Sequence, residues 1–398
     1  MKKAIKYIIV GIVCAGLSAC LTNLYRDLEL FFFADGDEKD ILQKKIAMVD
    51  TILEEGYIYD IDEKAMADYA VKGYVAGLDE PYTSYFTEEE FKNYTDSLED
   101  SYVGIGVVIS PTEDNFIEVV SAVEGSTAYQ AGIKPGDIIY KVDGEEYFGD
   151  TMDNAITKIK GGKEGEKVTL TLVRDGKEIE MEIERRVVVM NSVSSKMIDD
   201  QIGYLKISSF NVEGDESDTS TYTEFCEHIE NLKKSNVKKL IIDLRDNPGG
   251  ALEVVVDVAD ELLPEGLVTY IEYKDGTKEE HKSDKECMDI PIVVLVNENS
   301  ASASEVLTGA LKDHKKATVV GNTTYGKGVV QTVFPFSDGS GMSVTIAKYY
   351  TPSGVCIHGT GIEPDIKVEL DEKYKNYYAS ELTFEEDIQL QKAIEILK

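Results

Sequence analysis

The sequence predicts a multidomain protein of mixed α/β and α+β class, and three observations support this prediction. The chain has 398 residues, which is too long for one ordinary domain and fits about two or three. Between residues 101 and 185, short apolar runs are separated by Asp-Gly turns, a pattern typical of antiparallel hairpins. Beyond Gly203, fully apolar runs alternate with helical patterns, which indicates a sheet covered by helices on both faces.

The N-terminal segment has the charge and hydropathy pattern of an exported protein. Three lysines within the first six residues precede an apolar run from 7 to 21, which predicts a secretory signal or a short membrane anchor within residues 1–33. The run ends in Leu-Ser-Ala-Cys, which resembles a bacterial lipobox and would make Cys20 a lipidated residue. Apolar residues at 28–33 favour an uncleaved transmembrane anchor instead. Both alternatives predict an extracytoplasmic protein of the bacterial cell envelope that is tethered to the membrane.

Local patterns divide the remaining chain into four segments. Apolar residues spaced three and four apart predict a helical packing domain over 38–100, in which Pro81 ends one helix. The hairpin pattern covers 101–185, and the alternating strands and helices cover 186–370. An amphipathic pattern predicts a final helix within 371–398.

Composition and charge exclude several classes of function. Acidic residues outnumber basic residues by 75 to 41, and the resulting net charge of -34 repels phosphate backbones, so we expect no nucleic-acid partner. The five cysteines form no Cys-x-x-Cys pair, and the four histidines form no His-Glu-x-x-His motif. We therefore expect no disulfide framework, no metal site and no cofactor.

Three glycine-rich or serine-rich loops follow apolar strands in the alternating segment. They cover residues 243–250, 299–305 and 325–331. In an open α/β sheet the carboxyl ends of the strands form the ligand-binding edge, so these loops are the candidate site. In the second loop, Ser302 and Glu305 fit a capping box, so a helix cap is one interpretation. A hydroxyl at a helix N-terminus also lies in a field that favours its alkoxide, so a nucleophile is the other.

A serine nucleophile needs a general base, and the chain contains no Gly-x-Ser-x-Gly elbow. His314 and His358 lie outside any motif. Lys327 lies between two glycines beside an apolar strand, where burial would lower its pKa. Gln331 follows four residues later, a spacing that in an extended strand places both side chains on one face, so its amide would orient the lysine.

Two glycine patterns in these loops have alternative interpretations. Residues 321–327 fit most of a phosphate-binding loop, but Gly328 stands where a Ser or Thr would bind magnesium, and a strand pattern follows instead of a helix. We therefore reject a nucleotide site. Gly249 and Gly250 precede a helix, and their amides either form a tight turn or point at a developing oxyanion. The sequence does not choose between these two roles.

Together these motifs resemble the carboxy-terminal processing proteases, which are serine proteases with a Ser-Lys dyad. The resemblance covers almost the whole chain after the N-terminal segment. It is carried by the three loops, by Tyr-Tyr-Thr-Pro-Ser-Gly at 349–354, by Gly-Ile-Glu-Pro-Asp at 361–365 and by Leu-Asp-Glu-Pro-Tyr-Thr-Ser-Tyr at 78–85. It implies a ClpP/crotonase-like protease core with an inserted PDZ domain over 101–185.

The resemblance also implies an activity. It makes Ser302 the nucleophile, Lys327 the base and Gln331 the residue that supports the base. The expected enzyme is a serine endopeptidase that cleaves near the carboxyl end of protein substrates through an acyl-enzyme. A tail-binding PDZ adaptor with weak or no proteolysis is the alternative, and a histidine-based esterase is a third possibility that the missing elbow disfavours.

Binding roles follow from the same resemblance. The oxyanion hole would use the amide of Ala303 together with that of Gly249 or Gly250. In the PDZ domain, backbone amides of one loop would hold the terminal carboxylate of a peptide. That loop consists of Gly104, Ile105, Gly106 and Val107. The expected partners are proteins or peptides with apolar carboxyl-terminal tails and the membrane, with a homodimer as a further expectation.

Overall fold

The structure, a computed structural model, describes residues 41–398 except for 99–100, 113, 124, 190, 213–219, 285 and 375–376. The predicted signal or anchor, including Cys20, lies outside the described residues. No helix in the described ranges is long and apolar enough to cross a membrane. The chain divides into two compact units at Gly73, and each unit is described by itself.

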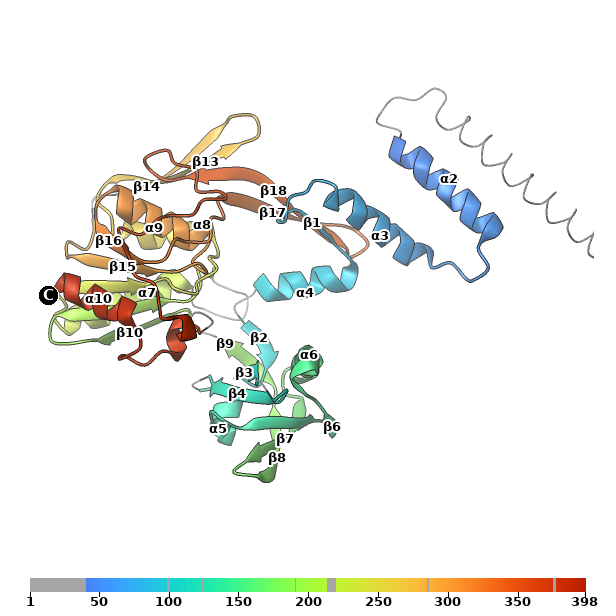
Figure 1. Cartoon of the computed structure of the whole chain (residues 1–398), viewed down its shortest axis with the longest axis horizontal. Coiled ribbons are helices and arrows are strands. Elements are labelled where there is room, and N and C mark those ends of the chain that lie inside the picture. The colour runs from blue at the N-terminus through green and yellow to red at the C-terminus, as the bar shows by residue number, and fades with distance from the viewer. Residues whose placement is uncertain are drawn as a thin grey trace, which may run out of the picture. The chain divides into compact units, whose positions relative to one another are not determined.

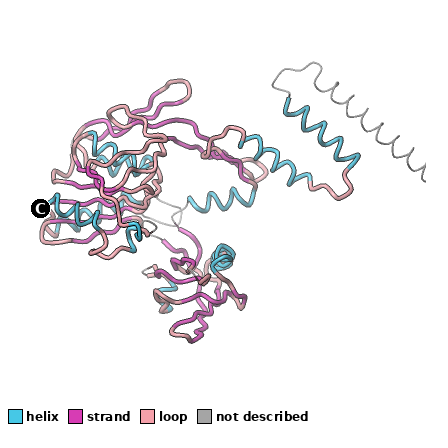
Figure 2. The backbone as a smooth tube through the Cα atoms, in the orientation of Figure 1, coloured by secondary structure: helices cyan, strands magenta, loops and turns pink. Residues whose placement is uncertain are grey.

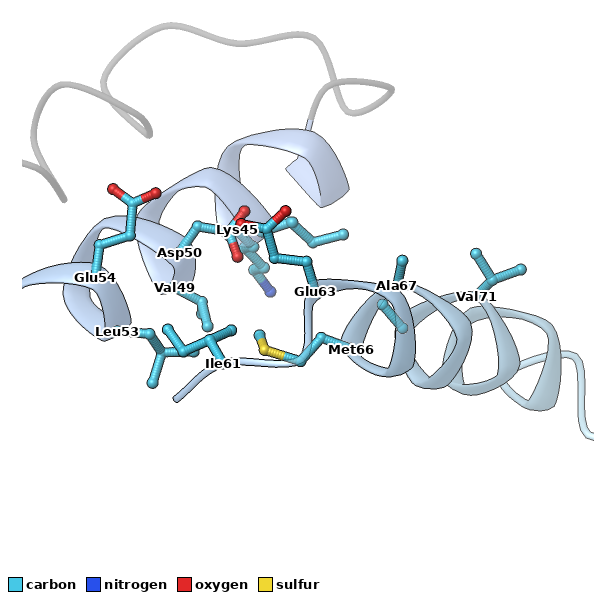
Figure 3. Close-up of a pocket in the computed structure, with 12 residues that line it drawn as sticks. Lys45, Val49, Asp50, Leu53, Glu54, Ile61, Glu63, Met66, Ala67 and Val71 are labelled. Carbon is cyan, nitrogen blue, oxygen red and sulfur yellow. The ribbon is translucent and has the colours of Figure 1, made fainter. Parts of the chain in front are cut away.

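The first unit contains a helical hairpin. Its helices are α2 (Ile41–Gly56) and the first part of α3 (Glu63–Ala76), which confirms the helical prediction for this stretch. The two helices flank an apolar groove of about 660 Å³, whose lining includes Val49, Leu53 and Met66 (Figure 3). No side chain of α2 is buried, so the apolar face of the helix is exposed.

The start of the second unit departs from the all-helical prediction for 38–100. β1 (Ser84–Phe86) precedes α4 (Glu88–Leu98) and pairs antiparallel with β18 (Gly341–Tyr350). A strand of three residues is too short to show an alternating pattern, and its partner is far away in the sequence. The local sequence therefore carried no signal for this strand.

The hairpin-rich segment forms an antiparallel sheet with its own apolar core. The strand order is β3-β4-β5-β7-β8, with β6 against β5. The strands are β3 (Val107–Pro111), β4 (Ile117–Ala122), β5 (Ile138–Val142), β6 (Glu145–Glu146), β7 (Lys167–Arg174) and β8 (Lys177–Glu184), and the helices are α5 (Thr127–Ala131) and α6 (Met152–Lys160). A separate pair, β2 (Ser101–Gly104) and β9 (Arg186–Val189), extends this segment to Val189.

Both Asp-Gly turns of this segment are present as predicted. Asp143 and Gly144 have φ values of 50° and 81°, and Asp175 and Gly176 have 51° and 72°. Two successive residues with positive φ form the tight turn that matches the twist of a hairpin. The Asp-Gly pairs therefore fix both the position and the register of the β5–β6 and β7–β8 hairpins.

The alternating segment forms the core, in which strands and helices are layered (Figures 1 and 2). Its main sheet has the strand order β10-β11-β12-β15-β16-β19. All neighbouring strands except β10 and β11 run parallel. The strands are β10 (Val193–Met197), β11 (Ile202–Ile207), β12 (Lys239–Asp243), β15 (Ile292–Val296), β16 (Ala317–Gly321) and β19 (Ile366–Lys367). The helices are α7 (Thr221–Lys234), α8 (Leu252–Asp260), α9 (Ala303–Asp313) and α10 (Ile388–Leu397).

Helices cover both faces of the main sheet, as the apolar strands predicted. α10 packs on one face, and α7, α8 and α9 pack on the other. The side chains alternate accordingly, since Leu240 and Ile242 of β12 point toward α8 and α9 while Ile241 lies in the cluster with α10. Every residue of β15 is buried, and its sequence is therefore a continuous apolar run.

A second, antiparallel sheet covers the outer side of α8 and α9 (Figure 1). Its order is β1-β18-β13-β14, and β17 pairs with β18. The strands not yet given are β13 (Gly266–Tyr273), β14 (Lys278–Ser283) and β17 (Val329–Pro335). Because β17 begins just after Lys327, this sheet carries one of the predicted site loops next to the start of α9.

Candidate active site

The three loops identified in the sequence meet at one edge of the main sheet. Residues 244–250 follow β12, 297–302 follow β15 and 322–328 follow β16. These three strands are parallel neighbours, so their carboxyl ends lie at the same edge. The topology thus brings three segments, the first and last of which are about 80 residues apart in the sequence, into a single site.

The three serines of the second loop differ in their surroundings. Ser300 and Ser304 are fully buried, and their hydroxyls donate to Leu244 O at 2.8 Å and to Asn247 O at 3.0 Å. They fasten the start of α9 to the loop that follows β12. Ser302 is only half-buried, so it is the serine of the run that a substrate can reach.

The backbone of Ser302 is strained. Its φ of 54° and ψ of -116° lie outside the regions that residues with a side chain prefer, and such a conformation costs about 1–3 kcal/mol. Gly249 makes room for it, because a Cβ on Gly249 would lie 2.7 Å from the Cβ of Ser302. In α/β-hydrolases, a strained strand-to-helix turn presents the nucleophilic serine.

The Glu305 carboxylate joins the two predicted dyad residues through their backbones. Its Oε2 accepts the N–H groups of Ser302 and Lys327, each at 2.9 Å. Its Oε1 accepts from Gly326 N at 2.7 Å and from Thr324 Oγ1 at 2.6 Å. Burial raises the pKa of Glu305, and these hydrogen bonds oppose the rise. Glu305 therefore both caps α9 and holds the Lys327 loop, so the cap and the nucleophile interpretations are compatible.

A second link between the same residues comes from Tyr349 on β18. Its hydroxyl lies 3.0 Å from Ser302 O and also contacts Lys327 O. Tyr349 is almost completely buried, and burial raises its pKa well above the ordinary value, so the phenol stays protonated. Ser302 and Lys327 are thus bridged at both their N–H groups and their carbonyls.

The side chain of Lys327 lies against an aromatic ring. Its Nζ is 5.2 Å from the ring centroid of Tyr82, a distance typical of a cation–π contact. Burial lowers the pKa of Lys327, in the predicted direction, while the charges of Glu80 and Glu305 oppose the shift. Within the described ranges, no hydrogen bond joins Lys327 Nζ to the hydroxyl of Ser302.

Gln331 is placed differently from the expectation. Its Nε2 donates to Thr345 Oγ1 at 3.3 Å, and among the described residues it forms no hydrogen bond with Lys327. The four-residue spacing assumed one continuous strand. Lys327 instead precedes β17, and an irregularity between Val330 and Gln331 breaks the alternation of side chains.

The two glycines of the Pro-Gly-Gly turn have different backbone partners. The amide of Gly249 donates to Asn247 Oδ1 at 2.8 Å and is thus used within its own turn. Gly250 lies beside Phe210, where a Cβ would be 2.1 Å from Phe210 O, and no acceptor for its amide is found in the described part of the chain. Of the two glycine amides in this turn, that of Gly250 therefore remains available.

The two candidate histidines lie in different places. His314 ends α9, twelve residues after Ser302, which is about 18 Å along the helix axis, and its Nε2 lies 2.8 Å from Leu267 O. This distance disfavours His314 as the base of a histidine-based esterase. His358 packs edge-on against Tyr82, with ring centroids 6.1 Å apart, and so lies beside the ring that contacts Lys327. The described residues also contain no group of three or more His, Cys, Asp or Glu side chains that could hold a metal ion.

Known proteins are similar in sequence to this chain over nearly its full length. The profile of peptidase family S41 matches residues 201–368, and that of the PDZ domain matches 118–174. The carboxy-terminal processing protease CtpA of Bacillus subtilis is 35% identical over 386 residues, which cover 95% of this chain and 80% of that protein. This chain belongs to peptidase family S41.

Further S41 relatives agree with this assignment. A CtpA-like serine protease of Staphylococcus saprophyticus is 36% identical over 339 residues, covering 84% of this chain and 67% of that protein. The structure of a photosystem II D1 C-terminal processing protease matches 88% of this chain and 92% of its own, with 27% identity and a TM-score of 0.50. An S41-type protein of Bacteroides fragilis has the same fold, with 17% identity, a TM-score of 0.58 and coverage of 87% and 96%. The predicted family and fold class are confirmed.

The loop predicted to hold a peptide carboxylate lies between β2 and β3. Gly104 ends β2, Ile105 is completely buried, and the chain turns at Gly106, whose φ is 78°. A Cβ on Gly106 would lie 2.3 Å from the Cβ of Ser126, so only glycine fits. β3, which begins at Val107, pairs with β4 alone among the described strands, so its other edge can accept an extended peptide.

Sequence reasoning missed two residues that act on Lys327. Glu80 and Tyr82 belong to the 78–85 signature, but the helical pattern around them led to an interpretation as packing only. That interpretation is wrong, because Tyr82 contacts Lys327 and the charge of Glu80 acts on it. The unusual Glu-Pro-Tyr run after the end of a helix was the only local signal.

Proposed function

We propose that the chain is a serine endopeptidase that binds protein tails through its PDZ domain and cleaves near their carboxyl end with a Ser302–Lys327 dyad. The double link between these residues carries the proposal. Glu305 binds both of their N–H groups, and the hydroxyl of Tyr349 contacts both of their carbonyls. The two backbones are thus held together before any substrate arrives.

In the acylation step, neutral Lys327 takes the proton of Ser302 Oγ while this oxygen attacks the scissile carbonyl carbon. The lysine head must first leave the Tyr82 ring and turn toward the serine. Burial supports this role, because it lowers the pKa of the lysine and so raises the fraction that is neutral. Gln331 lies on β17, which follows the Lys327 loop, and its amide is linked to Thr345 on β18; from there it would orient the lysine head as the head turns toward Ser302.

The remaining steps use backbone amides and water. The N–H groups of Ala303 and Gly250 would donate to the oxyanion, and Gly250 is preferred over Gly249 because the Gly249 amide already binds Asn247. When the tetrahedral intermediate formed by serine attack collapses, the C–N bond breaks, and the lysine ammonium gives its proton to the leaving amine. Lys327 then removes a proton from water, the water oxygen attacks the ester, and the serine leaves as the hydroxyl.

Tail recognition would precede the chemistry. An apolar carboxyl-terminal tail would add as a strand to the open edge of β3, and its carboxylate would meet the amides of the Gly104–Val107 loop. The name of the Bacillus subtilis relative, a carboxy-terminal processing protease, supports cleavage near the substrate's carboxyl end.

Labelling with a serine-directed fluorophosphonate tests the nucleophile. The probe should modify Ser302 alone, and Ser302→Ala should abolish labelling and lower peptide cleavage by several orders of magnitude. Ser300→Ala and Ser304→Ala are the matched controls, since both hydroxyls are buried and used in structural hydrogen bonds. Modification of Ser300 or Ser304 in the folded parent would contradict the assignment. Tail binding without labelling or cleavage would favour the adaptor alternative.

A further inference from the structure

The loop that precedes β1 is fastened to the strand behind the dyad. Thr345 of β18 donates its N–H to Thr83 Oγ1 at 3.1 Å and its hydroxyl to Glu80 Oε2 at 3.1 Å. The other oxygen of this carboxylate, Oε1, accepts Tyr82 N at 3.0 Å. These bonds fix both the carboxylate and the ring that follows it. A segment from the start of the second unit is thus built into the wall of the site.

Tyr82 presents a neutral ring to Lys327. Burial and a hydrogen bond with Tyr325 raise the pKa of Tyr82 to about 12, so the phenol keeps its proton near neutral pH. Its ring centroid lies 5.2 Å from Lys327 Nζ, and His358 packs against the same ring. The face of a neutral ring attracts an ammonium group but gives no such attraction to a neutral amine.

Glu80 supplies a negative charge close to the same lysine. Burial works to raise the pKa of Glu80, but hydrogen bonds from Thr83, Tyr82 and Thr345 outweigh it, so the pKa falls and the group is ionised at neutral pH. Its charge favours the protonated form of Lys327. No ion pair of 4 Å or less joins Glu80 to Lys327 among the described residues, so the effect acts through space and not through a direct contact.

Other titratable groups also face Lys327. Glu305 adds a second negative charge, the phenol of Tyr349 contacts Lys327 O, and Tyr325 lies in the same loop two residues before Lys327. His358 lies behind the Tyr82 ring. Glu305 and Tyr349 hold the backbone of the dyad, whereas Glu80 and Tyr82 are the groups that act on the lysine head.

We infer that Glu80 and Tyr82 are positioning residues for Lys327: the ring and the carboxylate hold the ammonium form of the lysine in place and oppose its conversion to the neutral base. The inference rests on the proposed function and deepens it. It predicts that this loop, and not the dyad alone, decides how much neutral lysine exists at a given pH. A substrate that displaces the Tyr82 ring would release the lysine toward Ser302.

The pH dependence of kcat/KM for a peptide substrate tests the inference in the full chain. The acid limb of the profile reports the lysine of the free enzyme. Removing the negative charge in Glu80→Gln lowers the pKa of Lys327, so the limb should move to lower pH, by on the order of 1 unit. Tyr82→Leu should move it in the same direction by a smaller amount.

Two matched variants distinguish effects of the Glu80 charge and the Tyr82 ring from effects of a local structural change. Tyr82→Phe keeps the aromatic face and should leave the limb where it is in the parent. Thr345→Val removes the hydrogen bonds that the Thr345 hydroxyl makes with Glu80 and with Gln331 but keeps the Glu80 carboxylate, so it should also leave the limb in place. If Thr345→Val moves the limb as far as Glu80→Gln does, the effect runs through hydrogen bonds and the inference is wrong.

The outcomes distinguish this inference from the proposed function. If the acid limb stays in place in both Glu80→Gln and Tyr82→Leu while cleavage still requires Ser302, the inference is wrong but the proposed function stands. Cleavage that survives Ser302→Ala overturns the proposed function. Thermal melting of each variant establishes that it is folded. If Glu80→Gln does not fold, the comparison of Tyr82→Leu with Tyr82→Phe decides.

Discussion

Lys327 is the residue on which the proposed chemistry depends most strongly. A lysine in water has a pKa of roughly 10.4, so almost none of it is neutral near pH 7. Burial lowers this pKa, and Glu80 and Glu305 oppose the shift. Activity should therefore rise as pH increases through the ionisation of the lysine. Because a guanidinium keeps its proton, Lys327→Arg should lower kcat/KM by about 10²–10⁴-fold.

Gln331→Ala provides a comparison for Lys327→Arg. It should cost less activity than Lys327→Arg, because Gln331 binds Thr345 and does not take the proton. The measurement is a pH–rate profile of both variants beside the parent. If Lys327→Arg cleaves as well as the parent, the base is another group, and His358 near Tyr82 becomes the first alternative.

At the scale of elements, β3 and the loop before it form the proposed tail site. Free peptide tails should bind the protein. The same tails with an amidated end should bind at least about tenfold more weakly, because amidation removes the charged carboxylate that would accept hydrogen bonds from the loop amides. Gly106→Ala should weaken tail binding as well, since a Cβ there meets Ser126 at 2.3 Å. Fluorophosphonate labelling of Ser302 is the control, and it should persist in Gly106→Ala. Equal affinity for free and amidated tails, measured by calorimetry, would exclude a carboxylate site.

At the scale of the whole molecule, Arg245 joins the last helix to the site. It is almost fully buried, and its guanidinium binds Asp243 at 2.6 Å and Asp387 at 2.8 Å, the latter being the N-cap of α10. Arg245→Leu leaves both carboxylates without their partner, so the free energy of unfolding at pH 7 should fall by about 3–5 kcal/mol. Lys234→Leu removes an exposed ion pair and should change it by less than about 1 kcal/mol.

The pH dependence of the Arg245 variant gives this prediction a second check. In the parent, burial works to raise the pKa of Asp243, but the charge and hydrogen bonds of Arg245 outweigh it and hold the pKa low. The stabilisation is therefore present above the unfolded pKa and is lost as pH falls through the folded one. In Arg245→Leu only Lys206 and the hydroxyl of Tyr204 still oppose the effect of burial on the pKa of Asp243, so the carboxyl is protonated more easily. Denaturant titrations should show a stability deficit that shrinks as pH falls, and a constant deficit would contradict the role of charge.

Much of this protein is determined by the local sequence. The Asp-Gly turns specify their own positive φ values, so both hairpins were predicted with their turns. The all-apolar run of β15 is explained by burial on both faces, which requires helices on each side. Ser302 and Lys327 were found because each lies in a short, distinctive motif. The family follows from the order of these motifs along the chain.

The tertiary structure alone decided which groups surround Ser302 and Lys327. β1 exists because β18 offers it a hydrogen-bonding edge, and no pattern within three residues can signal a distant partner. For the same reason Glu80 and Tyr82 were missed, since only that pairing brings their loop to Lys327. The proposal of Gly250 over Gly249 for the oxyanion depends on the hydrogen bond from Gly249 N to Asn247 Oδ1, which the sequence does not reveal. Local interactions are encoded by spacing, whereas contacts between distant segments depend on the folded topology.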